Sequence, residues 1–199
     1  MTTTASSVAG RVVLHPGDYH VTDQSITLTT LLGSCVAVCL YDPVRRVMGM
    51  NHFLLANRRY AKDMPVMASE AGRYGIHAME LLVNKLLAKG GQRRHLKAKA
   101  FGGGNVLGRS CDEQDNFLCV GAVNVRFVRE FLQNDRIPLV SADLGGNFGR
   151  QIHFTSTDFS VYMRKIPTSQ SAHLVEEERL YWKRSLEEHA HDTQQVELW

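Results

Sequence analysis

The sequence predicts an α/β (α+β) fold: a layered sandwich of mixed, largely antiparallel β-sheet with flanking helices, followed by a C-terminal helix. Two kinds of segment indicate it, namely short stretches rich in β-branched residues and longer stretches with apolar residues at helical spacing. Short turns join several of the expected strands, which favours hairpins over an all-parallel sheet. The chain of 199 residues is long enough for one domain with a sizeable core.

The first part of the chain is predicted to be mostly β-strand. Residues 1–10 are rich in Thr, Ser and Ala and are expected to form a flexible tail. The turn residues Asp42 and Pro43 join two apolar segments, which would pair as an antiparallel hairpin. The expected strands of this part lie at residues 19–21, 26–32, 35–41 and 47–55.

Two helices and further strands are predicted in the next part. Residues 69–89 are expected to be helical because apolar side chains recur at helical spacing, and the pair Gly90-Gly91 ends the segment. Residues 121–134 show the same spacing. The remaining expected strands lie at residues 96–101, 137–142, 151–155 and 160–165.

The character of the chain changes after Pro167. A polar linker leads into a highly charged helix at residues 174–190, either a solvated helix packed on the domain or a docking element for another protein. Its expected apolar anchors are Val175, Leu180, Trp182 and Leu186. The predicted organisation is a tail at residues 1–10, a main domain at 11–167 and a charged helical extension at 168–199.

Composition narrows the class of protein. The apolar fraction of 44% and the charged fraction of 22% are typical of a globular protein. The net charge of +3 is too small to indicate nucleic-acid binding. No run of about 18 apolar residues exists to insert into a membrane, and the N-terminus lacks the pattern of a secretory signal. A cytoplasmic location is therefore expected, with the four cysteines as free thiols.

Cys35 and His52 are the residues whose pattern indicates chemistry. Cys35 follows Gly33 and Ser34, where a glycine allows a sharp bend and the close approach of a substrate. A free thiol has a pKa near 8.5, so a nucleophilic cysteine needs a basic neighbour. His52 lies on the second strand of the expected hairpin, which would place it near Cys35 as that basic neighbour. The competing interpretation is a buried core thiol and an interior histidine.

Other ligand-binding patterns are weaker. The glycines at 102–104 follow a strand but lack the spacing of a phosphate-binding or dinucleotide-binding loop, so tight turns near the site are the better interpretation. Cys35, Cys39 and His52 have spacings that zinc tolerates, but no second cysteine pair with matching spacing follows. We therefore predict no metal and no cofactor, and interpret Cys39 as a core residue.

An ordered set of motifs resembles the chemoreceptor glutamine deamidase family CheD. The resemblance covers roughly residues 11–166. Its most specific part contains the Gly33-Ser34-Cys35 motif and continues to His52. The matching segments are residues 29–43, 49–55, 74–75, 78–80, 98–104, Gly121 with Asn124, 143–146 and 149–150.

The resemblance implies a role for each site residue. Cys35 would be the nucleophile, His52 the base and Thr29 the hydroxyl that orients the imidazole, while the adjacent Thr30 faces the opposite way in a strand. Backbone N–H groups around Gly33 and Ser34 would form the oxyanion hole. Two further residues are predicted to contact substrate, Asn51 and Arg150, although an ion pair is an equally good interpretation of Arg150.

The implied activity is that of a protein-glutamine glutaminase, which hydrolyses specific glutamine side chains of chemoreceptors to glutamate through a thioester. The implied partners are the helical cytoplasmic domains of chemoreceptors and, in some bacteria, a CheC-type CheY-phosphate phosphatase. Two alternatives remain open on the sequence. One is a binding module that regulates chemotaxis with weak catalysis, and the other is methylesterase action on receptor glutamate methyl esters by the same thiol chemistry.

Overall fold

A computed structural model describes residues 6–8, 10–55, 67, 69–106 and 120–196. Most of the predicted tail, Cys111 and Cys119 lie outside the described residues. None of the helices in the described part combines the length and the hydropathy that crossing a membrane requires.

The strands form two five-stranded sheets. The outer sheet has the order β1-β2-β4-β9-β10, with β1 at Ser6–Val8, β2 at Arg11–Val13, β4 at Thr27–Leu32, β9 at Gly149–Thr155 and β10 at Val161–Ile166. The central sheet has the order β3-β6-β5-β7-β8, with β3 at Tyr19–Thr22, β6 at Val47–Phe53, β5 at Val36–Asp42, β7 at Lys97–Gly102 and β8 at Leu139–Leu144. The pairs β2/β4 and β7/β8 are parallel, and the other pairs are antiparallel.

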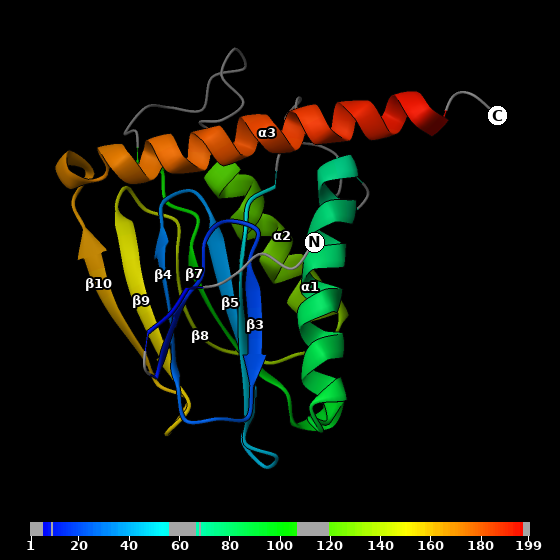
Figure 1. The fold of residues 1–199 in the computed structure, drawn as a ribbon, viewed down its shortest axis with the longest axis vertical. Helices are drawn as coiled ribbons and strands as arrows, with labels where there is room; N and C mark the ends of the chain where they lie inside the picture. The colour runs from blue at the N-terminus through cyan, green and yellow to red at the C-terminus, as the bar shows by residue number, and fades with distance from the viewer. Residues whose placement is uncertain (1–5, 9, 56–66, 68, 107–119, 197–199) are drawn as a thin grey trace.

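Helices cover one face and one end of this sandwich. The helices α1, at Glu70–Ala88, and α2, at Val120–Asn134, lie against the central sheet (Figure 1). Short 3-10 turns lie at Arg93–His95 and Thr168–Gln170. The helix α3, at Ala172–Val196, crosses above the ends of the strands (Figure 1). The predicted layered α+β sandwich with a C-terminal helix is confirmed.

The alternation of side chains along β5 explains why the central sheet is buried on both faces. Val36, Val38 and Leu40 face α1 and α2 in one core cluster. Ala37 and Cys39 face the outer sheet in a second cluster, together with Cys35 just before the strand. An apolar run without alternation is therefore the expected pattern for this strand.

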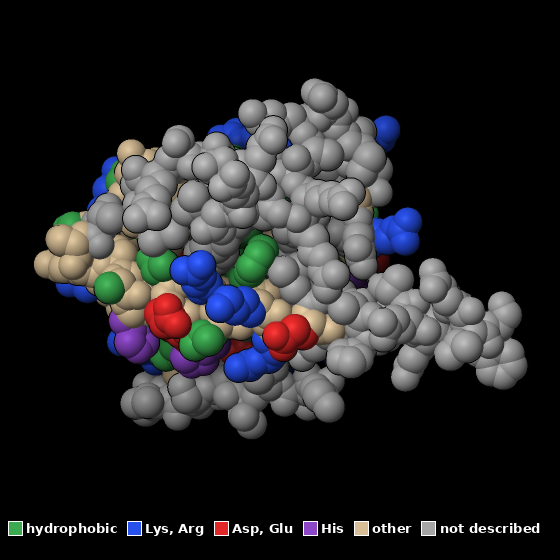
Figure 2. Space-filling model, turned by 90° about the horizontal axis from the view of Figure 1, so that it is seen from above, with side chains coloured by type: hydrophobic (Ala, Val, Ile, Leu, Met, Phe, Trp, Pro, Cys, Tyr) green, Lys and Arg blue, Asp and Glu red, His purple; other side chains and the backbone are tan. Residues whose placement is uncertain are grey.

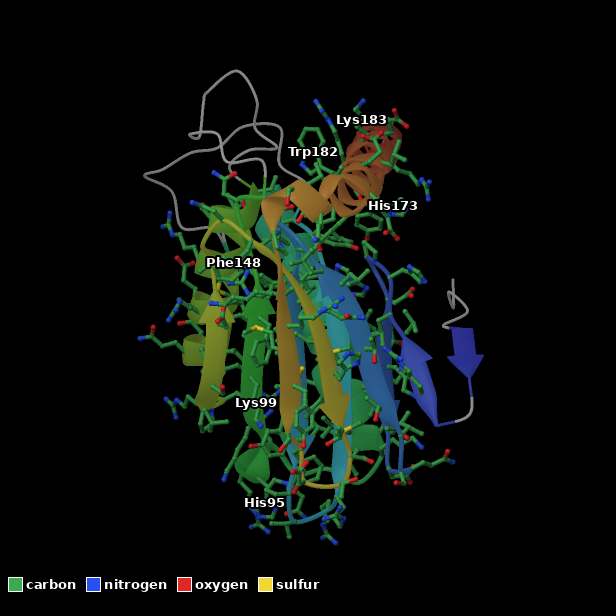
Figure 3. All side chains as sticks on the ribbon, turned by 90° about the vertical axis from the view of Figure 1, so that its left-hand side faces the viewer. His95, Lys99, Phe148, His173, Trp182 and Lys183 are labelled. Atoms are coloured by element: carbon green, nitrogen blue, oxygen red, sulfur yellow. The ribbon has the colours of Figure 1, made fainter. Side chains whose placement is uncertain are left out.

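The predicted helix at 174–190 exists, but one of its predicted anchors is wrong. Leu180 is 53% exposed, whereas Leu174 and Val175 are buried. Trp182 is partly buried, and the side chain of Leu186 lies outside the described residues. Figure 3 shows Trp182 on α3 at one end of the molecule and His95 at the opposite end, so the basic segment around His95 is remote from α3.

Candidate active site

Cys35 ends a tight turn that leads into β5, and its side chain is buried between the two sheets. The glycine-rich segment after β7 holds this turn from one side. The N–H of Gly104 donates to the carbonyl of Gly33 at 2.7 Å, and the N–H of Gly103 donates to the carbonyl of Cys35 at 2.7 Å. The backbone around the thiol is therefore fixed by hydrogen bonds from a neighbouring loop.

Asn124 on α2 holds the same turn from the other side. Its Nδ2 donates to the carbonyl of Ser34 at 2.8 Å, and its Oδ1 accepts the N–H of Leu55 at 2.9 Å. The side chain is fully buried, so these bonds satisfy groups that water does not reach. Sequence reasoning gave Asn124 no role. The available signal was a polar residue on the apolar face of a helix, between Val123 and Phe127.

His52 on β6 lies beside Cys35, as the predicted hairpin requires. In the antiparallel register Ala37 pairs with His52, which makes Cys35, two residues earlier on the same face, a diagonal neighbour of the imidazole. The sulfur of Cys35 and a ring nitrogen of His52 lie within 4.8 Å of each other. The backbone of His52 is held by the carbonyl of Asp18 at 2.9 Å and the N–H of Gly17 at 2.7 Å.

Thr30 orients the imidazole. Its Oγ1 donates to the carbonyl of Leu14 at 2.8 Å and lies 2.8 Å from Nδ1 of His52. Because the hydroxyl proton is given to Leu14, the hydroxyl oxygen accepts from Nδ1–H of His52. This assigns the tautomer from the hydrogen-bond network and leaves the lone pair on Nε2. Nε2 is buried and has no hydrogen-bond partner among the described residues.

The predicted orienting residue, Thr29, contacts other side chains than His52 in this structure. The Oγ1 of Thr29 accepts from Nε of Arg11 at 3.1 Å and lies 2.9 Å from Nδ1 of His153. Neighbouring residues of a strand point to opposite faces, and on β4 the face toward the second core cluster carries Leu28, Thr30 and Leu32. Thr29 therefore lies on the opposite face of the outer sheet from His52.

A carboxylate from α3 occupies the space in front of the Cys35 turn. Glu178 is 0% exposed. Its Oε1 accepts the N–H groups of Gly33 at 2.7 Å and Cys35 at 3.1 Å. Its Oε2 accepts the N–H of Ser34 at 2.7 Å and the hydroxyl of Ser34 at 2.7 Å. The backbone N–H groups of Gly33, Ser34 and Cys35 and the hydroxyl of Ser34 thus converge on one anion, an arrangement called here the anion cradle.

Burial and Glu178 set the protonation states of the thiol and the imidazole. Burial, the negative charge of Glu178 and a hydrogen bond with Glu178 raise the pKa of Cys35 well above its ordinary value. Complete burial lowers the pKa of His52 to about 3, and the neighbouring His15 adds to the effect. With Glu178 in place, the thiol is therefore protonated and the imidazole neutral near pH 7.

The same three side chains offer sulfur, nitrogen and oxygen atoms within 4.8 Å of one another, which is a set that can ligate a metal ion. Each oxygen of Glu178 already accepts two hydrogen bonds from the anion cradle. The lone pairs of this carboxylate are therefore largely occupied by hydrogen-bond donors. The N–H groups of the anion cradle suit an anion or a carbonyl oxygen and not a metal ion.

Two residues predicted to contact substrate have other partners. Arg150 is 1% exposed, and its Nε donates to Asp143 at 2.8 Å while its guanidinium lies over the ring of Phe148. Asn51 is buried, and its Oδ1 accepts the N–H of Val38 at 3.1 Å on the face toward α1. The polar groups of both residues are thus hydrogen-bonded inside the protein, and a substrate contact stays a prediction.

A small pocket beside α3 is lined in part by His52. The residues that line it include His15, Pro16, Leu31, His52, Leu174 and Glu177. The ring of His15 lies 3.3 Å from a carboxylate oxygen of Glu177, at the rim between the β2–β3 loop and α3. The pocket therefore lies between His52 and the rim formed by His15 and Glu177.

A layered α+β protein with a thiol beside an oriented imidazole, and N–H donors converging next to the sulfur, has the components that hydrolytic enzymes with a cysteine nucleophile require. The family model described as CheD chemotactic sensory transduction matches residues 54–165. The chain belongs to this family.

Curated relatives span almost the whole chain. A protein from Geobacter sulfurreducens named "Probable chemoreceptor glutamine deamidase CheD 1" is 53% identical over 184 residues, which cover 92% of this chain and 91% of that protein. One from Shewanella oneidensis named "Probable chemoreceptor glutamine deamidase CheD 2" is 48% identical over 179 residues, covering 89% and 88%. Among solved structures, a Bacillus licheniformis hypothetical protein, YfiH, has a TM-score of 0.40 at 17% identity, covering 63% of this chain and 50% of that one.

Proposed function

We propose that this protein hydrolyses glutamine side-chain amides of bacterial chemoreceptors to glutamate, with Cys35 as nucleophile and His52 as base. The observation that carries the proposal is the position of the anion cradle beside the Cys35 thiol, with the lone pair of His52 Nε2 unused. The names of the curated relatives support the substrate class.

In the first half of the reaction, Nε2 of His52 takes the proton of the Cys35 thiol and the thiolate attacks the amide carbon. The carbonyl oxygen becomes negative and is held by N–H groups of the anion cradle. When the C–N bond breaks, His52 returns the proton to the leaving nitrogen, and ammonia departs. Cys35 then carries the substrate as a thioester.

In the second half, His52 removes a proton from water, and the hydroxide attacks the thioester carbon. The C–S bond breaks and the Cys35 sulfur regains a proton. The net change is one water consumed, one ammonia released and one glutamine converted to glutamate. Thr30 acts as a positioning residue throughout, because its contact with Nδ1 of His52 keeps Nε2 directed at the reacting groups.

The test is mass spectrometry of a chemoreceptor cytoplasmic fragment co-expressed with this protein. We expect a gain of about one mass unit at specific glutamines with the wild type and none with Cys35→Ala. Cys39→Ala is the matched control, since Cys39 is a buried thiol in the same core cluster, four residues further along the chain. A fragment left unchanged by the wild type would overturn the proposal for that receptor.

The proposed partner is the helical cytoplasmic domain of a chemoreceptor, and the proposed location is the cytoplasm, where reducing conditions keep Cys35 as a thiol. The predicted second partner, a CheC-type phosphatase, stays a prediction that a binding measurement with such a phosphatase would test.

A further inference from the structure

The face of α3 that packs on the domain has a carboxylate at its centre. The inward positions recur at helical spacing and are Leu174, Val175, Glu178, Tyr181, Trp182 and Ser185. Among the described side chains, the outward face carries acidic and basic groups side by side (Figure 2). A charged residue in the middle of the inward face of an amphipathic helix is the reverse of what packing alone favours.

No Lys or Arg in the described part of the chain forms an ion pair with Glu178. The carboxylate is held instead by the anion cradle, the same donors that the proposed reaction needs for its oxyanion. Burying a charge without a counter-ion is unfavourable unless strong hydrogen bonds replace water. Glu178 is therefore bound at this site as a ligand would be, rather than as one partner of an ion pair.

The domain is shaped to receive this face of α3. A Cβ at Gly33 would lie 2.8 Å from Oε2 of Glu178, and a Cβ at Gly17 would lie 2.6 Å from the hydroxyl of Tyr181. The hydroxyl of Tyr181 also lies 2.8 Å from that of Tyr74 on α1. Side chains at either glycine would push α3 away, so the contact depends on close approach at two points.

We propose that α3 occupies the docking surface of a substrate helix and presents Glu178 to Cys35 as an internal analogue of the glutamate product. The proposal rests on the proposed function, because it assigns the Cys35 site a helical substrate whose glutamine side chain enters from the position of Glu178. The partner that fits the surface is thus a helix with a glutamine on an otherwise small or apolar stripe.

The hydrogen bonds favour glutamate over glutamine in the resting state. Both oxygens of a carboxylate accept, and here they meet only donors: three backbone N–H groups, the hydroxyl of Ser34 and the thiol of Cys35. An amide would direct its NH₂ group at one of these donors, where the three backbone N–H groups cannot accept and only the hydroxyl of Ser34 and the thiol of Cys35 can rotate. A product-like carboxylate is therefore held more tightly than a substrate-like amide, which suits an occupant that stays bound and is not turned over.

By occupying the site, Glu178 of α3 also keeps it inactive. Glu178 adds negative charge beside Cys35, which disfavours the thiolate, and it fills the donors needed for the oxyanion. The 3-10 turn at Thr168–Gln170 is a short tether that keeps the effective concentration of α3 high. A substrate helix must displace α3, so a receptor competes with a segment of the enzyme itself.

The decisive experiment converts the internal product analogue into an internal substrate. In the full-length E178Q variant, we expect Cys35 to hydrolyse the side-chain amide at position 178, which returns a carboxylate there and raises the mass of that peptide by about one unit. The double variant C35A/E178Q should keep the amide. Glu176→Gln is the matched control, because Glu176 is exposed on the same helix and should remain unconverted.

A full-length E178Q protein that keeps its amide overturns the inference, even where the wild type deamidates a receptor fragment, and the proposed function then stands alone. Conversion of E178Q without activity on any receptor supports the inference and overturns the receptor as substrate. Conversion in C35A/E178Q or at the Glu176→Gln site overturns the inference, since the change would then be spontaneous.

A second measurement covers an E178Q protein that fails to fold. Alkylation of Cys35 by iodoacetamide, followed by peptide mapping, should be about tenfold faster or more in folded Glu178→Ala than in the wild type, because the side chain that covers the thiol is gone. Glu176→Ala should react like the wild type. Equal rates in Glu178→Ala and the wild type would overturn the role of α3 as an occupant of the site.

Discussion

The hydroxyl oxygen of Thr30 lies 2.8 Å from Nδ1 of His52, and the two residues belong to different sheets. Thr30 also gives its proton to the carbonyl of Leu14, so the contact fixes both the orientation and the tautomer of the ring. The base of the proposed reaction therefore depends on the packing of one sheet on the other.

Thr30→Ala should lower the rate of receptor deamidation by about 10- to 100-fold, because the imidazole loses the partner that orients it. Thr30→Ser should retain most of the activity, since the hydroxyl remains. Thr29→Ala should act like the wild type, because its hydroxyl contacts Arg11 and His153 instead. Initial rates with a receptor fragment check all three, and equal losses in the alanine variants would contradict the assignment.

Stability should fall at acidic pH partly through His52. Its pKa is lowered to about 3 by burial, whereas an unfolded histidine titrates near 6.5. Above pH 6.5 the ring is neutral in both the folded and the unfolded chain, and this contribution to stability is fully present. As the pH falls from 6.5 toward 3, only the unfolded chain takes up the proton, so the free energy of unfolding decreases. The free energy of unfolding should fall by about 1.4 kcal/mol per pH unit more in the wild type than in His52→Gln.

Urea unfolding at pH 7, 6, 5 and 4 measures this difference. The pKa values of His20 and His153 are also lowered by burial, but both residues remain in the variant, so their effects cancel in the comparison. Parallel pH profiles for the wild type and His52→Gln would show that the ring is not buried as a neutral group.

Asn124→Ala should reduce both stability and activity. It removes the donor to the carbonyl of Ser34 and the acceptor for the N–H of Leu55, leaving two buried groups without partners. The expected loss in the free energy of unfolding is about 2–4 kcal/mol. Asn84→Ala, on the exposed side of α1, should change it by less than about 0.5 kcal/mol. A loss in Asn124→Ala no larger than in this control would contradict the role of Asn124.

Arg150→Met should destabilise the protein without a specific effect on catalysis. The guanidinium is buried against Asp143, and breaking a buried pair typically costs about 3 kcal/mol. The double variant with Asp143→Asn should lose less than the sum of the single variants. Urea unfolding gives these values, while kcat of the folded protein should stay within about threefold of the wild type. A large rise in KM with unchanged stability would restore a substrate-binding role.

The hairpin that brings Cys35 and His52 together was predictable, because a turn at Asp42 and Pro43 and two apolar segments define its register closely enough. To decide whether Thr29 or Thr30 contacts His52, one must know which face of the strand points into the core. Leu28 and Leu32 share a face with Thr30, so period-two alternation already favoured Thr30 over the residue that the resemblance implied.

The role of Glu178 was harder to predict. The apolar residues of the charged C-terminal helix predict Leu180 as an anchor, but the side chain of Leu180 is exposed. The helical spacing from Leu174 through Tyr181 places Glu178 on the inward face. Its partners, however, are backbone N–H groups of a distant turn, and no side-chain pattern marks such donors in a sequence.

The site combines residues from separate parts of the fold. Thr30 belongs to the outer sheet, His52 belongs to the central sheet, and the anion cradle lies at the edge where α3 crosses. No single hairpin or helix carries enough of it to function alone. Catalytic activity therefore depends on the two sheets remaining packed against each other. Enzymatic activity should be lost at a denaturant concentration equal to or lower than the one at which the strands unfold. No fragment of the chain should keep activity.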